Sequence, residues 1–232
     1  MQAAILAGAR SGSAGLRTKR AAVAFAVATL VVLLVSVLER AASSVGAGDR
    51  ALAATFRYVV PILALVWSGI ASGPLNLREA AWPASRFGHP RAGVGLGIVL
   101  ASLAAAAASA LVLAVVALVV TRAGADAGRG ALSLPMDLAV SSGVALLAGA
   151  SYAAWFGVAA TFGARGGGRL GFLIVDFILG GVSGAGAVLP RGGVFHLLGG
   201  EAPLDLPQRA TSAILIGMTL VCLALGFVRS RD

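Results

Sequence analysis

Two charged side chains, Arg57 and Asp176, lie inside the long apolar runs of the sequence. A charge in hydrocarbon is costly, so each of them needs a partner or water. At 1.5 Å per helical residue, Arg57 lies about 9 Å below the outer end of its run and the two depths differ by roughly 12 Å, so we do not expect a direct ion pair. The Arg57 side chain is long enough to snorkel to the outer interface. For Asp176 we expect either a structural hydrogen bond to a neighbouring helix or a role in a cavity or gate.

The string GVSG at residues 181–184 matches the GxSG pattern of rhomboid-type intramembrane serine proteases. Such enzymes need a helix-borne histidine to activate the serine, here Ser183. His196 falls in the following loop and His89 falls on the other side of the membrane, so proteolysis is only a minor alternative. A lone histidine beside apolar residues is usually structural, and we expect this of His196.

Nucleotide and metal chemistry are not expected in this chain. The phosphate-binding pattern GxxxxGK[ST] is absent, and the glycine-rich stretch GARGGGR at residues 163–169 lacks the lysine and hydroxyl that hold phosphate and magnesium. The single cysteine, Cys222, excludes an intrachain disulfide and a multi-cysteine metal site. We therefore expect no catalytic, cofactor or metal site, and any ATP chemistry must come from another polypeptide.

The composition is that of a membrane protein. Of 232 residues, 59% are hydrophobic and 12% are charged, against about 25% charged residues in ordinary soluble domains. One domain of this length cannot hide so many apolar side chains from water. The net charge of +9 does not indicate nucleic acid, because the basic residues flank apolar runs instead of clustering on a polar domain.

Six apolar runs are long enough to cross a bilayer as helices. They are Ala21–Leu38, Ala51–Ala71, Ala92–Val120, Leu138–Phe162, Leu170–Val188 and Ser212–Val228. The sequence thus predicts an all-α polytopic membrane protein, with an N-terminal segment over residues 1–20 and a six-helix transmembrane domain over residues 21–232. The first run is expected to be a retained signal anchor, since five more runs follow. The third run would be about 44 Å long as one helix, so it must tilt, kink or protrude.

The distribution of Lys and Arg predicts the orientation of the chain. With the N-terminus in the cytoplasm, that side carries eleven basic residues: Arg10, Arg17, Lys19, Arg20, Arg78, Arg86, Arg91, Arg165, Arg169, Arg229 and Arg231. The other side carries six: Arg40, Arg50, Arg122, Arg129, Arg191 and Arg209. Of the acidic residues, Glu39, Asp49, Asp126, Asp137, Glu201 and Asp205 fall outside, and Glu79 and Asp232 fall inside. This bias places both termini in the cytoplasm.

Small residues four apart recur within the runs: Gly93 and Gly97, Gly149 and Ala153, Ala153 and Gly157, and Gly180 and Gly184. Each pair shares a helical face on which two backbones can approach closely. In a chain with 32 glycines such pairs also arise by chance, so each is either a helix contact or a coincidence.

The longest cytoplasmic connection runs from Ser72 to Arg91. Within it, Arg78 and Glu79 lie among apolar residues that end at Trp82, which predicts an amphipathic helix of one to two turns stopped by Pro83. It is either an interfacial hairpin with Trp82 at the headgroups or a docking element for a cytoplasmic partner.

The outer segment over residues 189–211 contains a short apolar unit between paired glycines. Because this unit, Val194–Leu198, is too short to span, we expect it to dip into the outer interface as a re-entrant segment.

From residue 72 to the C-terminus, the sequence resembles the membrane subunit of type-2 ABC exporters. Three stretches carry the resemblance: Arg78-Glu79, Pro83 and Ser85-Arg86 before a long Gly-rich helix; FGARGGGRLGFLIVDFILGG at residues 162–181; and LP followed by HLLGG over residues 189–200. They are similar to the family's loop between helices two and three, its turn between helices four and five, and its outer re-entrant segment. Two features depart from the family: Gly95–Ile98 occupies the place of a basic residue early in helix three, and the N-terminal amphipathic helix is reduced to Met1–Gly15 and interrupted by Gly12 and Gly15.

The resemblance implies a permease in the bacterial cytoplasmic membrane, built from two copies or from one copy and a homologue. A separate cytoplasmic ABC ATPase subunit would bind the ATP, and residues Arg78, Glu79, Trp82 and Arg86 would couple it to the permease. Membrane lipid is the remaining expected partner, and the chain itself would catalyse nothing. The alternative function is a non-transporting membrane anchor or scaffold for a larger complex.

Overall fold

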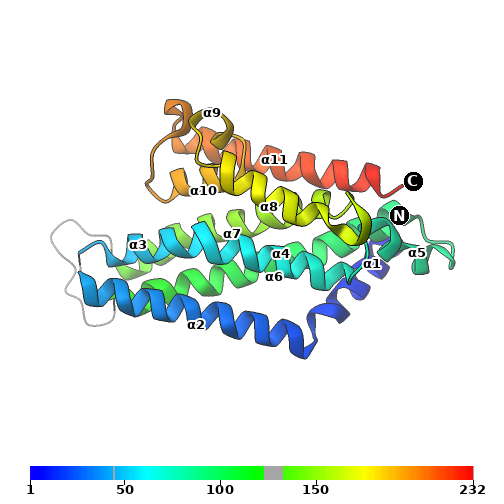
Figure 1. The fold of residues 1–232 in the computed structure, drawn as a ribbon, viewed down its shortest axis with the longest axis horizontal. Coiled ribbons are helices and arrows are strands. Elements are labelled where there is room, and N and C mark those ends of the chain that lie inside the picture. Colours follow the sequence, from blue (N-terminus) through cyan, green and yellow to red (C-terminus); the bar gives the residue numbers. More distant parts are fainter. Residues whose placement is uncertain (44, 123–132, 232) are drawn as a thin grey trace.

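The computed structural model describes residues 1–43, 45–122 and 133–231, all as helices, turns and connections (Figure 1). Asp126, Arg129 and Asp232, which entered the charge count, lie outside these residues. The elements are α1 (Gln2–Leu16), α2 (Lys19–Ala42), α3 (Ala47–Ala54), the π-turn η1 (Thr55–Val59), α4 (Val60–Ser72), α5 (Leu77–Ser85), α6 (Arg91–Arg122), α7 (Leu134–Ala159), the 3₁₀ turn η2 (Ala164–Gly166), α8 (Gly168–Leu179), α9 (Ser183–Gly186), α10 (Pro190–Leu197), the 3₁₀ turn η3 (Pro203–Asp205) and α11 (Gln208–Arg229).

The protein is a polytopic helical membrane protein. In the described residues, five stretches are long and apolar enough to cross a bilayer: α2, the stretch Ala47–Ser85 that includes α3, η1 and α4, then α6, α7 and α11. These correspond to five of the six runs expected from the sequence. Figure 1 shows them lying side by side along the long axis of the molecule, with α1 crossing obliquely at one end.

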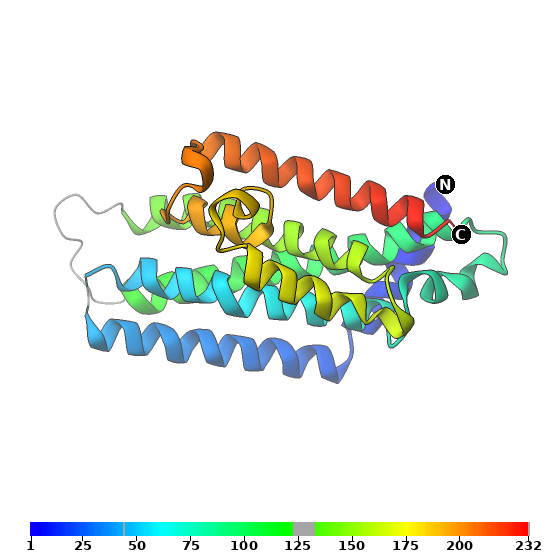
Figure 2. The same ribbon diagram turned by 45° about the horizontal axis from the view of Figure 1, so that its top comes forward.

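The fifth apolar run is not the single spanning helix that its composition predicts. Helix α8 has only 12 residues, which is about 18 Å and too short for the hydrocarbon core. It ends at Gly180, after which the chain turns through the short helices α9 and α10 (Figure 2). The expected count of six spanning helices is therefore not confirmed at Leu170–Val188, where the structure has a 12-residue helix followed by a folded-back segment.

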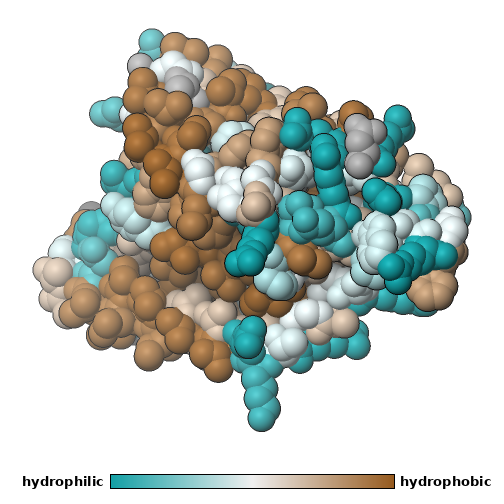
Figure 3. Space-filling model, turned by 45° about the vertical axis from the view of Figure 1, so that its right-hand side comes forward, coloured by the Kyte–Doolittle hydropathy of each residue, from teal (hydrophilic) through white to brown (hydrophobic). Residues whose placement is uncertain are grey.

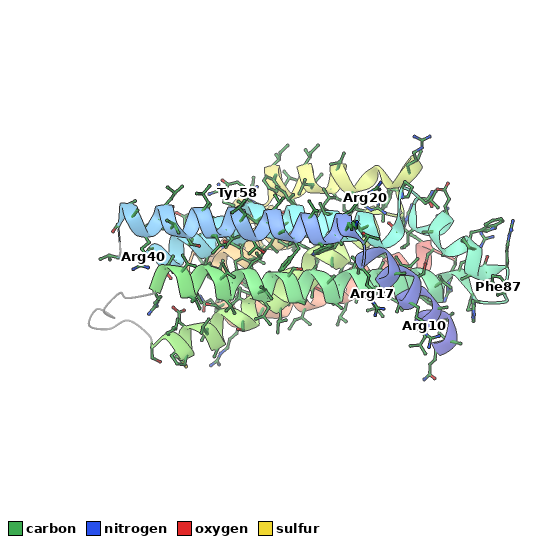
Figure 4. All side chains as sticks on the ribbon, turned by 90° about the horizontal axis from the view of Figure 1, so that it is seen from below. Arg10, Arg17, Arg20, Arg40, Tyr58 and Phe87 are labelled. Carbon is green, nitrogen blue, oxygen red and sulfur yellow. The ribbon has the colours of Figure 1, made fainter. Side chains whose placement is uncertain are left out.

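Both termini lie at the same end of the bundle, called here the terminal end (Figures 1 and 2). Arg10, Arg17, Arg20 and Phe87 lie toward that end, and Arg40 lies at the opposite end (Figure 4). In the view of Figure 3, hydrophilic atoms gather toward the terminal end, and hydrophobic atoms cover much of the remaining surface. This arrangement agrees with a bundle whose sides face lipid and whose ends face water.

The centre of the bundle is the contact between α6 and α7. At Gly149 the two helices approach so closely that a Cβ atom there would lie 2.6 Å from the Ala106 carbonyl oxygen. Tyr152, Phe156 and Leu113 are fully buried in the surrounding core. Gly149 thus lies in a close contact between two helices. This is the first of the two alternatives for the small-residue pairs, a helix contact as opposed to a coincidence.

Helix α6 has 32 residues and begins at the terminal end. There α1 packs across it, with Gly8 of α1 against the Val94 backbone and Gly97 of α6 against Ile5 and Ala9. The third run is thus one continuous helix from Arg91 to Arg122. The expectation that α1 is interrupted by glycine is wrong: α1 is continuous from Gln2 to Leu16, because its glycines permit close helix packing instead of ending the helix.

Candidate functional site

Helix α5 carries the residues that the sequence links to a cytoplasmic partner. It begins with a capping box, in which the Asn76 side chain accepts from the Glu79 N–H (2.9 Å) and the Glu79 carboxylate accepts from the Asn76 N–H (3.3 Å). The expected stop at Pro83 is wrong, since the helix continues to Ser85. Pro83 removes one backbone donor, and one further turn is stabilised by the Ser85 hydroxyl, which donates to the Trp82 carbonyl (2.7 Å).

One side of α5 is fastened to the ends of the spanning helices. Leu77 is buried and its N–H donates to the Ala160 carbonyl at the end of α7 (3.0 Å). The Arg78 Nε donates to the Arg229 carbonyl at the end of α11 (2.8 Å). The Arg229 Nε in turn donates to the Thr161 hydroxyl (3.1 Å). Helix α5 is therefore bonded to the ends of two membrane helices, α7 and α11.

The other side of α5 faces outward from the bundle. Trp82 is 42% exposed and Phe87, in the turn after the helix, is 83% exposed. The Arg86 guanidinium lies 3.8 Å from the centroid of the Trp82 ring, which is a cation–π stack. Of the four predicted coupling residues, Arg78 and Glu79 hold α5 in place, whereas Trp82 and Arg86 form an exposed pair.

Arg169 is a buried structural residue whose role its place in a glycine-rich stretch did not predict. It is 7% exposed, and its Nη2 donates to the Ser72 hydroxyl and to the Leu75 carbonyl (3.4 Å). Burial lowers the pKa of the Arg169 guanidinium from its usual value. The side chain joins the start of α8 to the connection between α4 and α5. Its buried Nε has no hydrogen-bond partner in the described residues.

Asp176 lies fully buried near the end of α8. Its Oδ1 accepts from the Arg191 N–H in the first turn of α10 (3.1 Å), so a side chain of one helix caps another. Its side chain lies near that of Tyr152, and its Oδ2 and the Tyr152 hydroxyl are both buried without a hydrogen-bond partner in the described residues. The structural hydrogen bond, one of the two expected roles, is present.

Arg57 lies in the π-turn η1, where it is exposed. As expected, it does not pair with Asp176. The two segments nevertheless meet, since the rings of Tyr58 and Phe177 lie 6.2 Å apart. The Arg57 Cζ is 5.5 Å from the Tyr58 ring centroid, and the Arg191 Cζ is 5.8 Å from the same centroid. One aromatic ring thus lies beside two guanidinium groups.

A cavity of about 290 Å³ opens at this meeting point. Its charged lining residues are Arg57, Arg191 and Glu201, and its apolar lining includes Phe177 and Leu198. The wall also depends on glycine, because a Cβ at Gly192 would overlap the backbone of Gly186. The cavity lies where the half-helix α8 ends, and its walls come from segments far apart in the chain, so the sequence pattern does not predict it.

The remaining polar candidates are near the same place. His196 is buried, with Nδ1 3.3 Å from the Gly200 carbonyl oxygen, which fits the expected structural role. Of the GxSG string, the Ser183 side chain lies outside the part of the structure that is described.

Nothing among the protein-family models, curated proteins and solved structures compared with this chain matches it.

Proposed function

We propose that this protein is the permease subunit of an ATP-driven ABC exporter in the bacterial cytoplasmic membrane. It works as a dimer or with a homologous partner, and a separate cytoplasmic ATPase subunit binds and hydrolyses the ATP. The terminal end is the cytoplasmic end, and this chain contributes no catalytic, nucleotide or metal site. The observation that carries the proposal is helix α5, which presents the exposed pair of Trp82 and Arg86 on one side and is bonded to the spanning helices on the other.

The exposed side of α5 supports docking. Tryptophan and arginine are the residues most enriched among the energetic anchors of protein interfaces, and Trp82 and Arg86 are stacked together here. Phe87 extends the apolar surface by one more exposed ring at the tip of the connection. A lipid-facing hairpin would also expose aromatic rings. The capping box instead favours a defined helix that presents its surface in one orientation.

The side of α5 that is bonded to the bundle could transmit a displacement of α5 to the spanning helices. Helix α5 is hydrogen-bonded to α7 at the Ala160 carbonyl and to α11 at the Arg229 carbonyl. The connection before α5 is bonded to α8, because Arg169 donates to the Leu75 carbonyl. A displacement of α5 would therefore move these helices together as a rigid body. Helix α8 leads directly to the cavity at the opposite half of the bundle, so this route joins the ATPase side to the far side of the membrane.

The test is co-purification of the tagged protein, followed by mass spectrometry of the bound subunits. We expect an ATPase with a GxxxxGK[ST] motif. Replacing Trp82→Ala together with Glu79→Gln should reduce the bound ATPase about 30-fold, the effect of losing an interface anchor worth about 2 kcal/mol. Glutamine preserves the capping box, so α5 should stay folded. Val45→Ala, a change at an 82% exposed site near the opposite end, is the control and should leave binding unchanged.

The variants also separate transport from anchoring. If the ATPase is still bound and still stimulated by the double variant, the coupling role of α5 is wrong. If the wild-type protein retains a stable complex that contains no such ATPase, the alternative of a membrane anchor or scaffold replaces the permease.

A further inference from the structure

Arg57 lies within a predicted membrane-spanning run and has no counterion among the described residues. In the described residues, no carboxylate or hydrogen-bond acceptor lies within bonding distance of its guanidinium. The arginines at the opposite end differ from it, since Arg50 is paired with Glu39 at 2.6 Å and Arg122 with Asp137. Intramembrane cations persist when they face a partner or a polar cavity, and Arg57 faces the cavity of about 290 Å³.

Arg191 supplies a second guanidinium to the same cavity, and its position is fixed. Its Nη1 donates to the Phe177 carbonyl (3.0 Å), and its Cζ lies 4.2 Å from the Phe177 ring centroid. Its backbone N–H is held by Asp176. A guanidinium offers five donors, so Arg191 retains donors for a ligand. Two arginines that share one cavity match a phosphate group.

Glu201 adds a carboxylate to the lining. It makes no ion pair with Arg57 or Arg191 in the described residues. The three lining charges therefore fit a ligand that carries an anion and a cation close together. A phosphate would lie at the arginines and an ammonium at Glu201.

The size and surroundings of the cavity indicate a lipid. Its volume is at the lower limit of the roughly 300–1,000 Å³ of small-molecule sites, enough for a headgroup. Exposed apolar side chains follow the adjacent face of α8, among them Ile174 and Ile178 at 57% and 65% exposure. Acyl chains emerging from the cavity would lie along this face. A lipid would contact both the charged cavity and this apolar face, whereas a soluble ligand would contact the cavity alone.

We propose that this cavity binds the headgroup of a zwitterionic phospholipid, with the phosphate at Arg57 and Arg191 and the ethanolamine ammonium at Glu201. The site goes beyond the proposed transport function and does not depend on it. A lipid held here would lie against η1 and the end of α8.

The test is native mass spectrometry of the purified full-length protein titrated with phosphatidylethanolamine or phosphatidylglycerol. Wild type should favour phosphatidylethanolamine. Arg57→Gln should weaken binding of both lipids at least about tenfold, the effect of losing one charge-assisted hydrogen bond. Because Arg57 makes no hydrogen bond in the described residues, this variant should fold normally. Glu201→Gln should remove the preference for ethanolamine and retain binding of phosphatidylglycerol.

The control is Arg209→Gln, which removes an exposed arginine at the start of α11, outside the cavity lining. It should bind both lipids as wild type does. Equal lipid binding by Arg57→Gln and wild type would overturn the site. If phosphoethanolamine without acyl chains displaces the lipid at equal concentration, the cavity binds a soluble zwitterion, and the assignment to a lipid is wrong.

Discussion

Replacing Gly149 with alanine should destabilise the protein, whereas the same replacement at Gly143 of the same helix should not. A Cβ at position 149 would lie 2.6 Å from both the Ala106 carbonyl oxygen and the Ala107 Cα, about 1 Å inside a normal contact of ~3.5–4.0 Å. Both atoms belong to the α6 backbone, so no side chain can rotate away. Overpacking of this kind costs about 1–3 kcal/mol. At Gly143 an added Cβ would meet nothing within 4 Å.

The matched pair isolates the packing cost. Both variants gain the same helix preference of alanine over glycine, about 0.5–1 kcal/mol, so it cancels when they are compared. The free energy of unfolding, measured by titrating detergent-solubilised protein with a denaturing detergent and following the helical circular dichroism, should be lower for Gly149→Ala than for Gly143→Ala by about 1–3 kcal/mol. If the two variants are equally stable, α6 and α7 do not approach at Gly149, and the arrangement of the bundle core is wrong.

Two further predictions concern the cap at α10 and the orientation of the chain. Asp176→Leu should be less stable than Asp176→Asn by about 1–3 kcal/mol, because leucine leaves the Arg191 N–H without an acceptor and asparagine keeps one; equal thermal stability and equal hydrogen exchange at this amide would refute the cap. Cysteine placed at Phe87, which is 83% exposed, should react with an impermeant maleimide only in inside-out vesicles, and cysteine at Leu204, 61% exposed, should react in intact cells. The native Cys222 is only 5% exposed and serves as the unreactive background. Labelling of the Phe87 position in intact cells would reverse the orientation.

The apolar runs predicted where the chain crosses the bilayer but not where a crossing breaks. Hydropathy measures the free energy of transferring each side chain from water to lipid. Because Leu170–Val188 is apolar over most of its length, this measure predicts one continuous span there. The helix ends because Gly180 and the folded-back segment after it are held from outside the run: the α10 backbone N–H at Arg191 bonds to Asp176, and Gly192 packs on Gly186. These contacts join residues whose distance in space is not visible in a hydropathy pattern.

Two errors at the terminal end have the same origin. Gly12 and Gly15 have a low helix propensity, so local reasoning predicts a break in α1. In the structure their missing side chains permit contact with Ile98 and with Ile70, and tertiary packing outweighs a propensity cost of about 1 kcal/mol per glycine. Pro83 likewise costs α5 one hydrogen bond but does not end it. Glycine and proline predict the end of an isolated helix well, but they predict it less well where neighbouring helices pack against the backbone.

The unusual length of α6 has a physical explanation at the terminal end. Its 32 residues give a rod of about 48 Å, and its first turns contact three separate parts of the chain. Helix α1 packs on it at Gly97, and Gly95 lies against Ser230 after α11 and near Leu77 of α5. A side chain at either glycine would push these pieces away from the rod. On the proposed function, this explains why Gly95 and Gly97 stand where the permeases that the sequence resembles carry a basic residue. The start of α6 is a packing surface for α5, and a long charged side chain there would separate α5 from α6.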